Sequence, residues 1–352
     1  MTTTSILPPG TQAFRLAKAI AVGRGDVLSA EGFALGKGWH AVADAIRKSV
    51  IAPLSEADAV AVLRPYAIDL ADALRPMTIL GRLTAARKVK TRVRFIAASG
   101  GATGSFVAEG APTPFSAMAL ATAGTIEPSK CVAALVQSAE LFEESLEGTQ
   151  DLLRNDLLAA CAEAADAAFI APDNGGAPGR PASITNAGVQ LTSSGATLAN
   201  VDADLKALIS AHVAAGNSLE NAVLVGHPRS LTHIGSLRGS AGSSAFPSVG
   251  AKGGAIWGIP VLASASCDMG NSPSETVLAI VEADQILVAD DGPLVVEVTR
   301  EASLQLSDAP SANAAQEISL WQNNLLALKL VRWINWRARR TGAASSIVGI
   351  NY

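Results

Sequence analysis

The chain has 352 residues, of which 49% are hydrophobic and 16% charged, and its formal net charge at pH 7 is −4. This near balance of charge excludes the strongly basic surface that is typical of general nucleic-acid binders. The mean hydropathy of +0.30 is high for a soluble monomer, yet the sequence has no run of about eighteen apolar residues that would predict a transmembrane helix. We therefore expect apolar surface to be buried between subunits, and we expect no membrane partner.

The three cysteines, Cys131, Cys161 and Cys267, lack the spacing of metal ligands. They fit buried thiols in a reduced cytosolic chain better than a disulfide framework. Residues 1–9 lack the positive segment and the apolar core of a secretory signal, which argues against export.

Helical patches at residues 14–20 and 39–46 predict two short helices, separated by a joint at residues 23–38 that is rich in glycine and alanine. Residues 64–80 contain two Arg-Pro steps, and the residue before a proline disfavours the helical conformation. We expect this last stretch to be an arm with short helical pieces.

Residues 88–95 alternate cations with uncharged residues, so a strand over this range would carry four positive charges on one face. These cations are Lys88, Lys90, Arg92 and Arg94. Either the face is solvated and protects an exposed sheet edge from aggregation, or it contacts acidic groups on a neighbouring subunit. Contact with packaged nucleic acid is a less favoured functional interpretation, and four charges alone do not decide between these alternatives.

A flexible glycine-rich tip at residues 97–104 is followed by a second extended run up to Thr125. Together with the preceding strand, this run predicts a long β-hairpin that has too few apolar residues to bury itself. An isolated two-stranded hairpin is marginally stable in water. We therefore expect the hairpin to lie on something else.

The next stretch predicts a strand at residues 131–137, a short helical piece at 138–145 and one long helix at 149–171 with Thr149 as its N-cap. Apolar residues recur at three- and four-residue steps along the long helix, which indicates one buried face. These residues are Leu153, Leu157, Cys161, Ala164 and Ala168.

Residues 185–290 predict a second, mixed α/β unit. Asp202 is expected to cap a helix that Gly216 closes, and Pro228 suits the first turn of the next helix. A long flexible loop is expected at residues 240–254. Strands are expected at 222–226, 256–262, 276–281 and 294–299. Apolar residues from Leu326 to Trp336 fit a period of two, and a helix is the alternative for this stretch.

Residues that could carry catalysis are scarce. His212 lies on the apolar stripe of its helix and is expected to be a core histidine. His227 and His233 lack a metal-ligand spacing, and a helix cap or a surface role is favoured for them. The glycine-rich residues 100–104 and 250–254 lack the Gly-Lys-Ser/Thr of a phosphate-binding loop. We therefore predict no catalytic, cofactor-binding or metal-binding residue and no cofactor; a cytosolic hydrolase that uses His227 or His233 is an alternative from a different class.

Five stretches, taken in order, resemble the major capsid proteins of tailed phages, which have the Hong Kong 97-type fold. They are the extended loop Phe106-Val-Ala-Glu-Gly-Ala-Pro-Thr-Pro114, the strand-to-helix step at residues 132–145, the strand, proline and helix at 222–230, the strand at 257–262, and the closing strands within 295–351. Each motif is weak alone, but their order is fairly specific, and the resemblance covers roughly residues 93–352.

This resemblance implies an α+β fold with a peripheral domain, an axial domain, an extended β-hairpin loop and an N-terminal arm. The implied division is an N-terminal helical extension at residues 1–55, the arm at 56–92, the extended loop at 93–130, the peripheral domain at 131–182 and 293–340 with its spine helix at 149–171, and the axial domain at 183–292 and 341–352. The expected subunit-interface residues are Lys88, Lys90, Arg92, Arg94, Phe106, Glu109, Pro112 and Pro114.

The resemblance also implies a structural protein and not an enzyme. The expected function is that of a major capsid protein, which assembles with itself as pentamers and hexamers into the icosahedral shell of a virion. Such a shell is built in the host cytoplasm and encloses double-stranded DNA without sequence-specific binding. Portal and scaffolding proteins are the expected partners, with a decoration protein as a further candidate. An encapsulin-type nanocompartment, which shares the fold but encloses cargo enzymes, is the alternative.

Two departures from the family pattern refine this expectation. Some members crosslink a loop lysine to an asparagine with the help of a glutamate, whereas here Thr113 stands at the loop position, Asn324 at the asparagine position and Val331 at the glutamate position. We therefore expect a shell without covalent crosslinks. Only the first 55 residues or so could serve as a cleaved scaffolding segment, so a separate scaffolding protein is expected.

Overall fold

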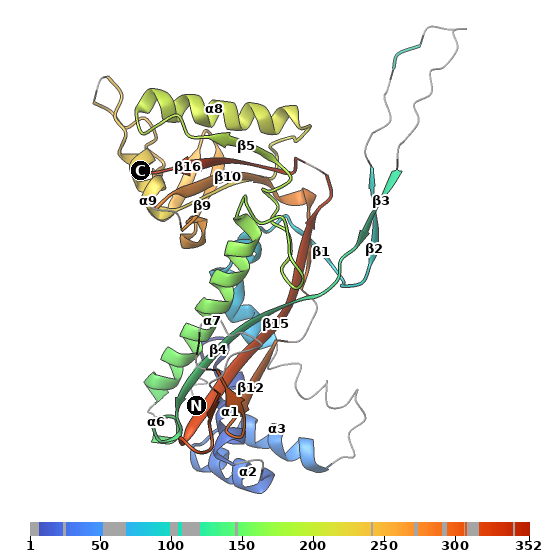
Figure 1. Ribbon diagram of the computed structural model, residues 1–352, viewed down its shortest axis with the longest axis vertical. Coiled ribbons are helices and arrows are strands. Elements are labelled where there is room, and N and C mark those ends of the chain that lie inside the picture. The colour runs from blue at the N-terminus through green and yellow to red at the C-terminus, as the bar shows by residue number, and fades with distance from the viewer. Residues whose placement is uncertain are drawn as a thin grey trace, which may run out of the picture. The chain divides into compact units, whose positions relative to one another are not determined.

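The computed structural model describes residues 7–23, 26–51, 68–98, 105–107, 120–144, 147–240, 242–270, 274–290, 294–305, 307, 317–340 and 342–352. The chain forms two compact units, each of which draws on segments far apart in the sequence. Unit 1 consists of Met1–Gly81, Lys130–Ala162 and Gly292–Trp333, and unit 2 consists of Arg82–Ser129, Glu163–Asp291 and Ile334–Tyr352. Both units combine helices with sheet strands, as expected for an α+β fold (Figure 1).

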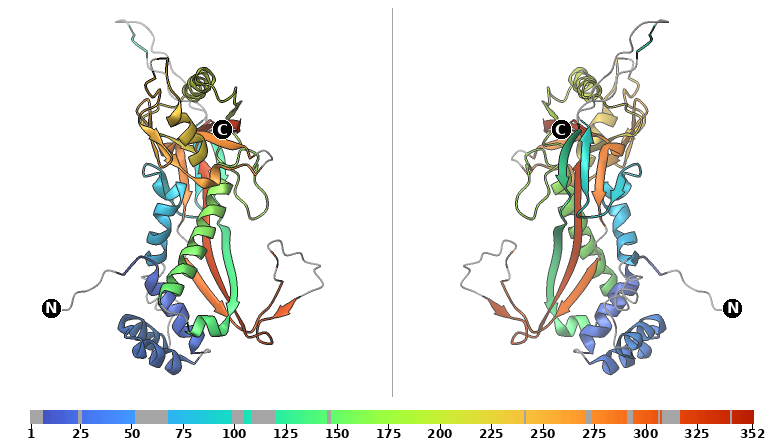
Figure 2. Two further views of the ribbon diagram at one scale, coloured as in Figure 1. Left: turned by 90° about the vertical axis from the view of Figure 1, so that its left-hand side faces the viewer. Right: turned by 90° about the vertical axis from the view of Figure 1, so that its right-hand side faces the viewer.

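Three helices near the N-terminus gather into one group within unit 1 (Figure 2). They are α1 (Thr11–Val22), α2 (Val27–Gly36) and α3 (His40–Ile51). Leu16, Ala34 and Trp39 are among the buried residues of their shared apolar core. The opposite side of α1 contributes Phe14 to a second and larger core, so α1 is an integral part of unit 1.

The expected joint at residues 23–38 is wrong, because α2 occupies most of it. The Asp26 carboxylate accepts a hydrogen bond from the backbone N–H of Ser29 at 3.0 Å and so provides the N-cap. The Ser29 hydroxyl also donates to this carboxylate, and it holds the pKa of Asp26 below its usual value together with the backbone contact. Ala30 and Ala34 are buried against the neighbouring helices, and this packing offsets the low helix propensity of the glycines in α2.

The larger core of unit 1 lies between helices and sheet strands. The strands are β4 (Ser129–Ser138), β12 (Val295–Thr299) and the first part of β15 (Leu325–Ala338), and the long helix is α7 (Glu147–Ile170). Strands β4 and β12 both pair with β15. Leu157 of α7 and Leu328 of β15 are both buried in this core. The predicted strand at 131–137, the period of two in β15 and the long helix are therefore confirmed, although the helix begins before Thr149.

The buried face of α7 is broader than the predicted stripe. Ala164 is exposed, whereas Arg154 and Asp166, which the apolar pattern left off the stripe, are buried. The guanidinium of Arg154 donates a hydrogen bond to Thr11 Oγ1 and pairs with the Asp151 carboxylate at 3.0 Å. Polar contacts of this kind satisfy a buried charge, and a pattern based on hydrophobicity does not detect them.

Several short helices and strands connect the longer elements. They are η1 (Arg75–Met77), α5 (Ile79–Arg82), α6 (Ala139–Glu144), β13 (Ser303–Leu304), β14 (Ile318–Ser319), η2 (Ala265–Cys267) and η3 (Ala283–Gln285).

Unit 2 is built around a seven-stranded sheet of order β5-β16-β10-β6-β9-β8-β7. In that order the strands are Val189–Thr192, Ala344–Ile350, Thr276–Glu282, Ala222–Gly226, Ile259–Ala263, Gly253–Ile256 and Val249–Gly250. All seven residues of the interior strand β10 are buried. Helices α8 (Leu198–Ala214) and α9 (Pro228–Ser236) contribute Leu208 and Leu231 to the same core. The strands predicted at 222–226 and 276–281 are confirmed, as is Pro228 at the first turn of its helix.

Three expectations for unit 2 are wrong. Helix α8 begins earlier than predicted, because the N-cap is Thr197, whose hydroxyl accepts from Asn200 N–H; Asp202 lies inside the helix. The expected loop at 240–254 contains β7 and the start of β8, since Phe246 and Val249 enter the core. The expected strand at 256–262 is two strands, because the chain turns at Trp257 and Gly258, both of which have positive φ.

Gly254 lies where the backbone leaves no room for a side chain. Its φ is +140°, and an added Cβ would stand 1.8 Å from the carbonyl oxygen of Ser248. Gly254→Ala should therefore lower the free energy of unfolding by at least about 2 kcal/mol in chemical denaturation. Gly250→Ala is the matched control in the same hairpin, because a Cβ there would meet nothing within 4 Å. Equal stability of the two variants would contradict the geometry.

Candidate subunit interface

The basic segment lies in unit 2, where the chain passes between two sheets. Strand β1 (Arg87–Val89) pairs in parallel with β11 (Ile286–Ala289) and forms the edge of its sheet. The chain then turns, and β2 (Arg94–Ala98) pairs antiparallel with β3 (Leu120–Thr125). Arg92 lies in the turn with a φ of 61°, and its backbone N–H donates to the Ile126 carbonyl at 2.8 Å.

The expectation of one continuous strand over residues 88–95 is therefore wrong. The left-handed conformation of Arg92 interrupts it, so the four cations do not share one strand face. All four are nevertheless exposed. Among the described residues, no carboxylate forms an ion pair with Lys88, Lys90, Arg92 or Arg94. The segment thus presents a set of cations that the described part of its own chain does not neutralise.

A small apolar cluster anchors the base of the hairpin. Ile126, Leu287 and Ala289 are buried together, and Val89 packs against them. Beyond this base, β2 and β3 form a two-stranded sheet in which each pairs only with the other among the described strands (Figure 1). The hairpin is thus fixed at its root while its two strands receive no further strand from the described part of the chain.

The remaining predicted interface residues fall between β2 and β3 in the sequence. The Phe106 side chain is fully exposed, at 109% relative accessibility. Glu109, Pro112 and Pro114, together with Thr113 at the loop position of the family crosslink, lie outside the described residues. An exposed phenylalanine costs solvation free energy in an isolated chain, and burying it in a contact recovers about 2 kcal/mol.

The two other positions relevant to crosslinking lie in unit 1. Asn324 has a φ of 51°, its carbonyl accepts from Ala139 N–H at 2.9 Å, and its side-chain amide donates to Glu140 Oε1 at 3.2 Å. Val331 is buried within β15, where it pairs with Val295. Asn324 thus joins the turn before β15 to α6. The sequence analysis missed its contact with Glu140, because no local pattern links two residues 184 positions apart.

The histidines considered for catalysis have structural contacts. His227 is the N-cap of α9, and its Nδ1 accepts from Arg229 N–H at 3.1 Å, which confirms the expected helix cap. Burial lowers the pKa of His227, while Asp268 opposes that shift. His233 Nε2 lies 2.9 Å from the Ala196 carbonyl oxygen, which fixes this nitrogen as the donor.

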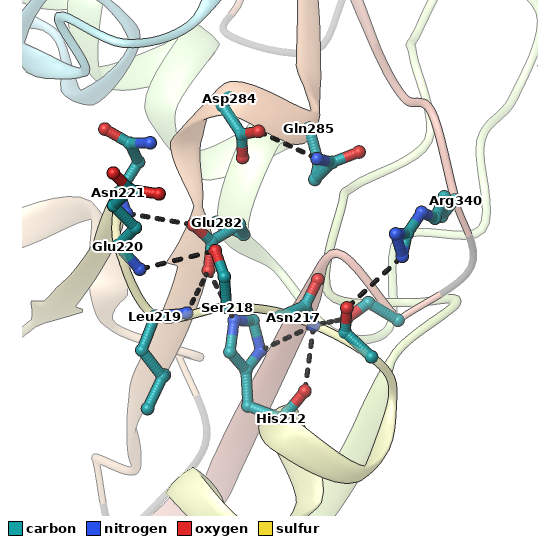
Figure 3. Close-up of polar contacts among 12 residues, drawn as sticks. His212, Asn217, Ser218, Leu219, Glu220, Asn221, Glu282, Asp284, Gln285 and Arg340 are labelled. Carbon is teal, nitrogen blue, oxygen red and sulfur yellow. Dashed lines mark hydrogen bonds and ion pairs between the residues drawn. The ribbon is translucent and has the colours of Figure 1, made fainter. Parts of the chain in front are cut away.

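His212 is fully buried, as predicted, and belongs to a polar network in unit 2 (Figure 3). Its Nε2 lies 3.5 Å from Glu282 Oε2, and the buried Glu282 carboxylate also accepts from the backbone N–H groups of Leu219 and Asn221 at 3.2 and 3.0 Å. The Asn217 amide donates to the carbonyl of His212 at 2.9 Å and contacts its Nδ1 at 3.3 Å. Burial lowers the pKa of His212, and the Glu282 carboxylate only partly opposes this effect.

This network predicts a loss of stability in mild acid. Because the folded-state pKa of His212 lies below its unfolded value of 6.5, the unfolded chain binds the proton more readily. The contribution of His212 to stability is therefore complete above pH 6.5 and declines as the pH falls toward the folded pKa. The free energy of unfolding should fall more between pH 7.5 and pH 5.5 in the wild type than in His212→Gln. Chemical denaturation at both pH values measures the effect. An equal fall in both proteins would contradict the role given to His212.

Within the described ranges, no group of three histidine, cysteine, aspartate or glutamate side chains is placed to hold a metal ion. Of the helices in these same ranges, none combines the length and apolar character that a membrane span requires.

Known proteins resemble this chain in both sequence and fold. Residues 67–314 match the family model of the phage capsid family. The capsid polyprotein of Pseudomonas phage PAJU2 is 31% identical over 370 residues; the alignment covers 99% of this chain but 55% of that protein, so the chain spans about half the length of its curated relative.

Three solved structures show the same fold at low identity. A structure from Mycobacterium phage Ogopogo has a TM-score of 0.58 and 16% identity, and covers 77% of this chain and 91% of its own. One from Gordonia phage Cozz has a TM-score of 0.54, 13% identity and coverages of 77% and 85%. The capsid of a native GTA particle computed with C5 symmetry has a TM-score of 0.53, 15% identity and coverages of 76% and 88%. The resemblance inferred from the sequence motifs is therefore confirmed: the chain belongs to the phage capsid family and has the Hong Kong 97-type fold.

Proposed function

We propose that the chain is a major capsid protein, which assembles as pentamers and hexamers into an icosahedral virion shell around double-stranded DNA. The observation that carries the proposal is the match of residues 67–314 to the phage capsid family. The β2–β3 hairpin supports it, because this pair receives no third strand from the described chain and a two-stranded ribbon alone is marginal in water. A neighbouring subunit would supply the missing support.

The presence of two units supports a two-domain division, although unit 2 also includes residues 163–182 and 334–340 of the expected peripheral domain. We assign the peripheral domain to residues 131–182 and 293–340, around the spine helix α7, and the axial domain to residues 183–292 and 341–352, around the seven-stranded sheet. Residues 93–130 are the extended loop and 56–92 the arm. The helical extension at 1–55 includes α1, which is buried in the same core as α7. This packing favours a separate scaffolding protein, because removal of α1 would open that core.

We assign the basic segment to contact with acidic groups of a neighbouring subunit. Lys88, Lys90, Arg92 and Arg94 are exposed and have no acidic partner in the described chain. A candidate complement is present on every copy, because residues 140–151 contain five acids and no base. Phe106, Glu109, Pro112 and Pro114 of the loop are assigned to the same interface.

Charge reversal tests this assignment. The double variant Lys90→Glu/Arg92→Glu should assemble less than the wild type at low salt, and the difference should shrink near 1 M salt, where the screening length falls from about 10 Å to about 3 Å. The assembled fraction is measured by sedimentation. Arg238→Glu/Lys252→Glu is the matched control, because both residues are exposed and the change in net charge is the same. Equal losses in both variants would overturn the assignment.

The shell is proposed to be held by noncovalent burial alone. Val331 supplies no carboxylate at the glutamate position, and Asn324 is engaged by Glu140. Portal and scaffolding proteins, with a decoration protein as a further candidate, are the proposed partners. The DNA is enclosed without sequence-specific contacts, and the protein is a structural component of the virion and not an enzyme.

Expression of the full chain with its scaffolding partner tests the function. The proposal expects sedimenting particles that protect DNA from nuclease and dissociate to single chains in denaturing gels. Particles that enclose protein cargo and no nucleic acid would contradict the DNA-enclosing function, and ladders of crosslinked chains would contradict the noncovalent shell.

A further inference from the structure

Two of the three cysteines lie side by side in unit 1. Cys131 is on β4 and Cys161 is on α7, and their Sγ atoms are 3.7 Å apart. Cys161 is fully buried in the larger core, and Cys131 packs against that core from the strand. A disulfide has an S–S length of about 2.05 Å, so the two sulfur atoms need to approach by less than 2 Å.

The surroundings of the two thiols favour reaction at Cys131. Its thiol is half-buried, and its pKa is lowered to about 7 by the hydrogen bond from Cys161 and by the positive charge of Arg332, against the opposing effect of burial. This shift favours the thiolate form at Cys131, which lies next to a second sulfur. Cys267 provides the contrast, because burial, aided by Asp166, raises its pKa to about 12. That buried thiol has no comparable reactivity.

We propose that Cys131 and Cys161 form a latent intrachain disulfide site, which closes when the protein meets a small-molecule disulfide. The Cys131 thiolate attacks one sulfur of the oxidant, forms a mixed disulfide and releases one thiolate. Cys161 then loses its proton and attacks the Cys131 sulfur, which expels the second thiolate. In total, two protein thiols are oxidised to one disulfide and one small disulfide is reduced to two thiols.

The bond would fasten β4 to α7 within one subunit. It would close a loop from residue 131 to residue 161, which restricts the unfolded chain and stabilises unit 1. If the proposed shell function holds, the site would stay reduced during assembly in the cell and would close after release into an oxidising medium. The chemistry itself needs no second subunit, so its test is independent of assembly.

The experiment uses the reduced, unassembled full chain, which is incubated with oxidised glutathione at pH 8 and then alkylated. After alkylation under denaturing conditions, the wild type should carry one alkyl group, on Cys267, and should have lost two hydrogen atoms. A non-reduced tryptic digest should contain the peptide beginning at Cys131 joined to the peptide carrying Cys161. Its melting temperature should rise by roughly 5 °C or more, and reduction should reverse the rise.

Variants separate the two steps. Cys161→Ala should stop at a persistent glutathione adduct on Cys131, whereas Cys267→Ala should behave as the wild type. A wild type that keeps three free thiols, accumulates a stable adduct at Cys131 or forms only interchain disulfides would overturn the proposal. The wild-type measurement is decisive by itself if a variant fails to fold.

Discussion

Replacing Glu282 with alanine is expected to lower the free energy of unfolding by about 2–6 kcal/mol, because two backbone N–H groups lose their acceptor at a cost of about 1–3 kcal/mol each. The carboxylate is 1% exposed, accepts from the backbone N–H groups of Leu219 and Asn221, and faces His212 (Figure 3). Alanine leaves these partly buried donors without an acceptor, and each such loss is costly. Chemical denaturation of the unassembled subunit at pH 7.5 measures the effect.

Two controls make the Glu282 result specific. Glu282→Gln retains one oxygen acceptor of similar shape and should lose less stability than the alanine variant. Glu220→Ala removes an exposed acid from the neighbouring turn and should change stability by no more than about 0.5 kcal/mol. Equal free energies of unfolding for Glu282→Ala and Glu220→Ala would show that the network does not stabilise unit 2.

Shortening the hairpin is expected to abolish assembly while leaving the subunit folded. Ala98 pairs with Leu120 at the end of the β2–β3 ladder, so residues 99–119 can be replaced by Asn-Gly, which favours a two-residue hairpin turn. The change removes Phe106, Glu109, Pro112 and Pro114. Particle yield, measured by sedimentation and negative-stain microscopy, should fall at least tenfold.

The melting temperature of the unassembled subunit is the control for the shortened hairpin. Because the root cluster of Ile126, Leu287 and Ala289 is untouched, this temperature should stay within about 3 °C of the wild type. A folded variant that assembles at the wild-type yield would show that the hairpin has no partner on another subunit.

Elements with a clear apolar pattern could be predicted from the sequence. The period of two from Leu326 to Trp336 predicted β15, and the apolar run at 276–281 predicted the fully buried β10. The strand at 131–137 and the long helix α7 were predicted for the same reason. In each case the hydrophobic pattern and the tertiary packing agree, so local information is sufficient.

Elements whose limits depend on polar contacts could not be predicted from the same pattern. Asp26 and Thr197 set the starts of α2 and α8 through single hydrogen bonds to the backbone. The turn at Arg92 contains no glycine or proline at its left-handed position, so alternation alone suggested a continuous strand. Turns held by contacts with distant backbone, such as Arg92 with Ile126, carry no local signal.

The sequence predicted which residues belong to the candidate interface, but it did not predict how they are arranged in space. The family motifs located the loop that contains Phe106, and the structure leaves this side chain exposed. The contact between Asn324 and Glu140, and the proximity of Cys131 to Cys161, depend on folding that brings distant segments together. No spacing rule could have indicated either pair.

A cryo-electron microscopy reconstruction of nuclease-treated particles tests the central claim most directly. The account predicts a closed shell of five-fold and six-fold clusters in which residues 94–125 of each subunit lie across an adjacent subunit. A reconstruction in which these residues pack only against their own subunit would contradict the account, as would a chain that stays monomeric at high concentration with its scaffolding partner present.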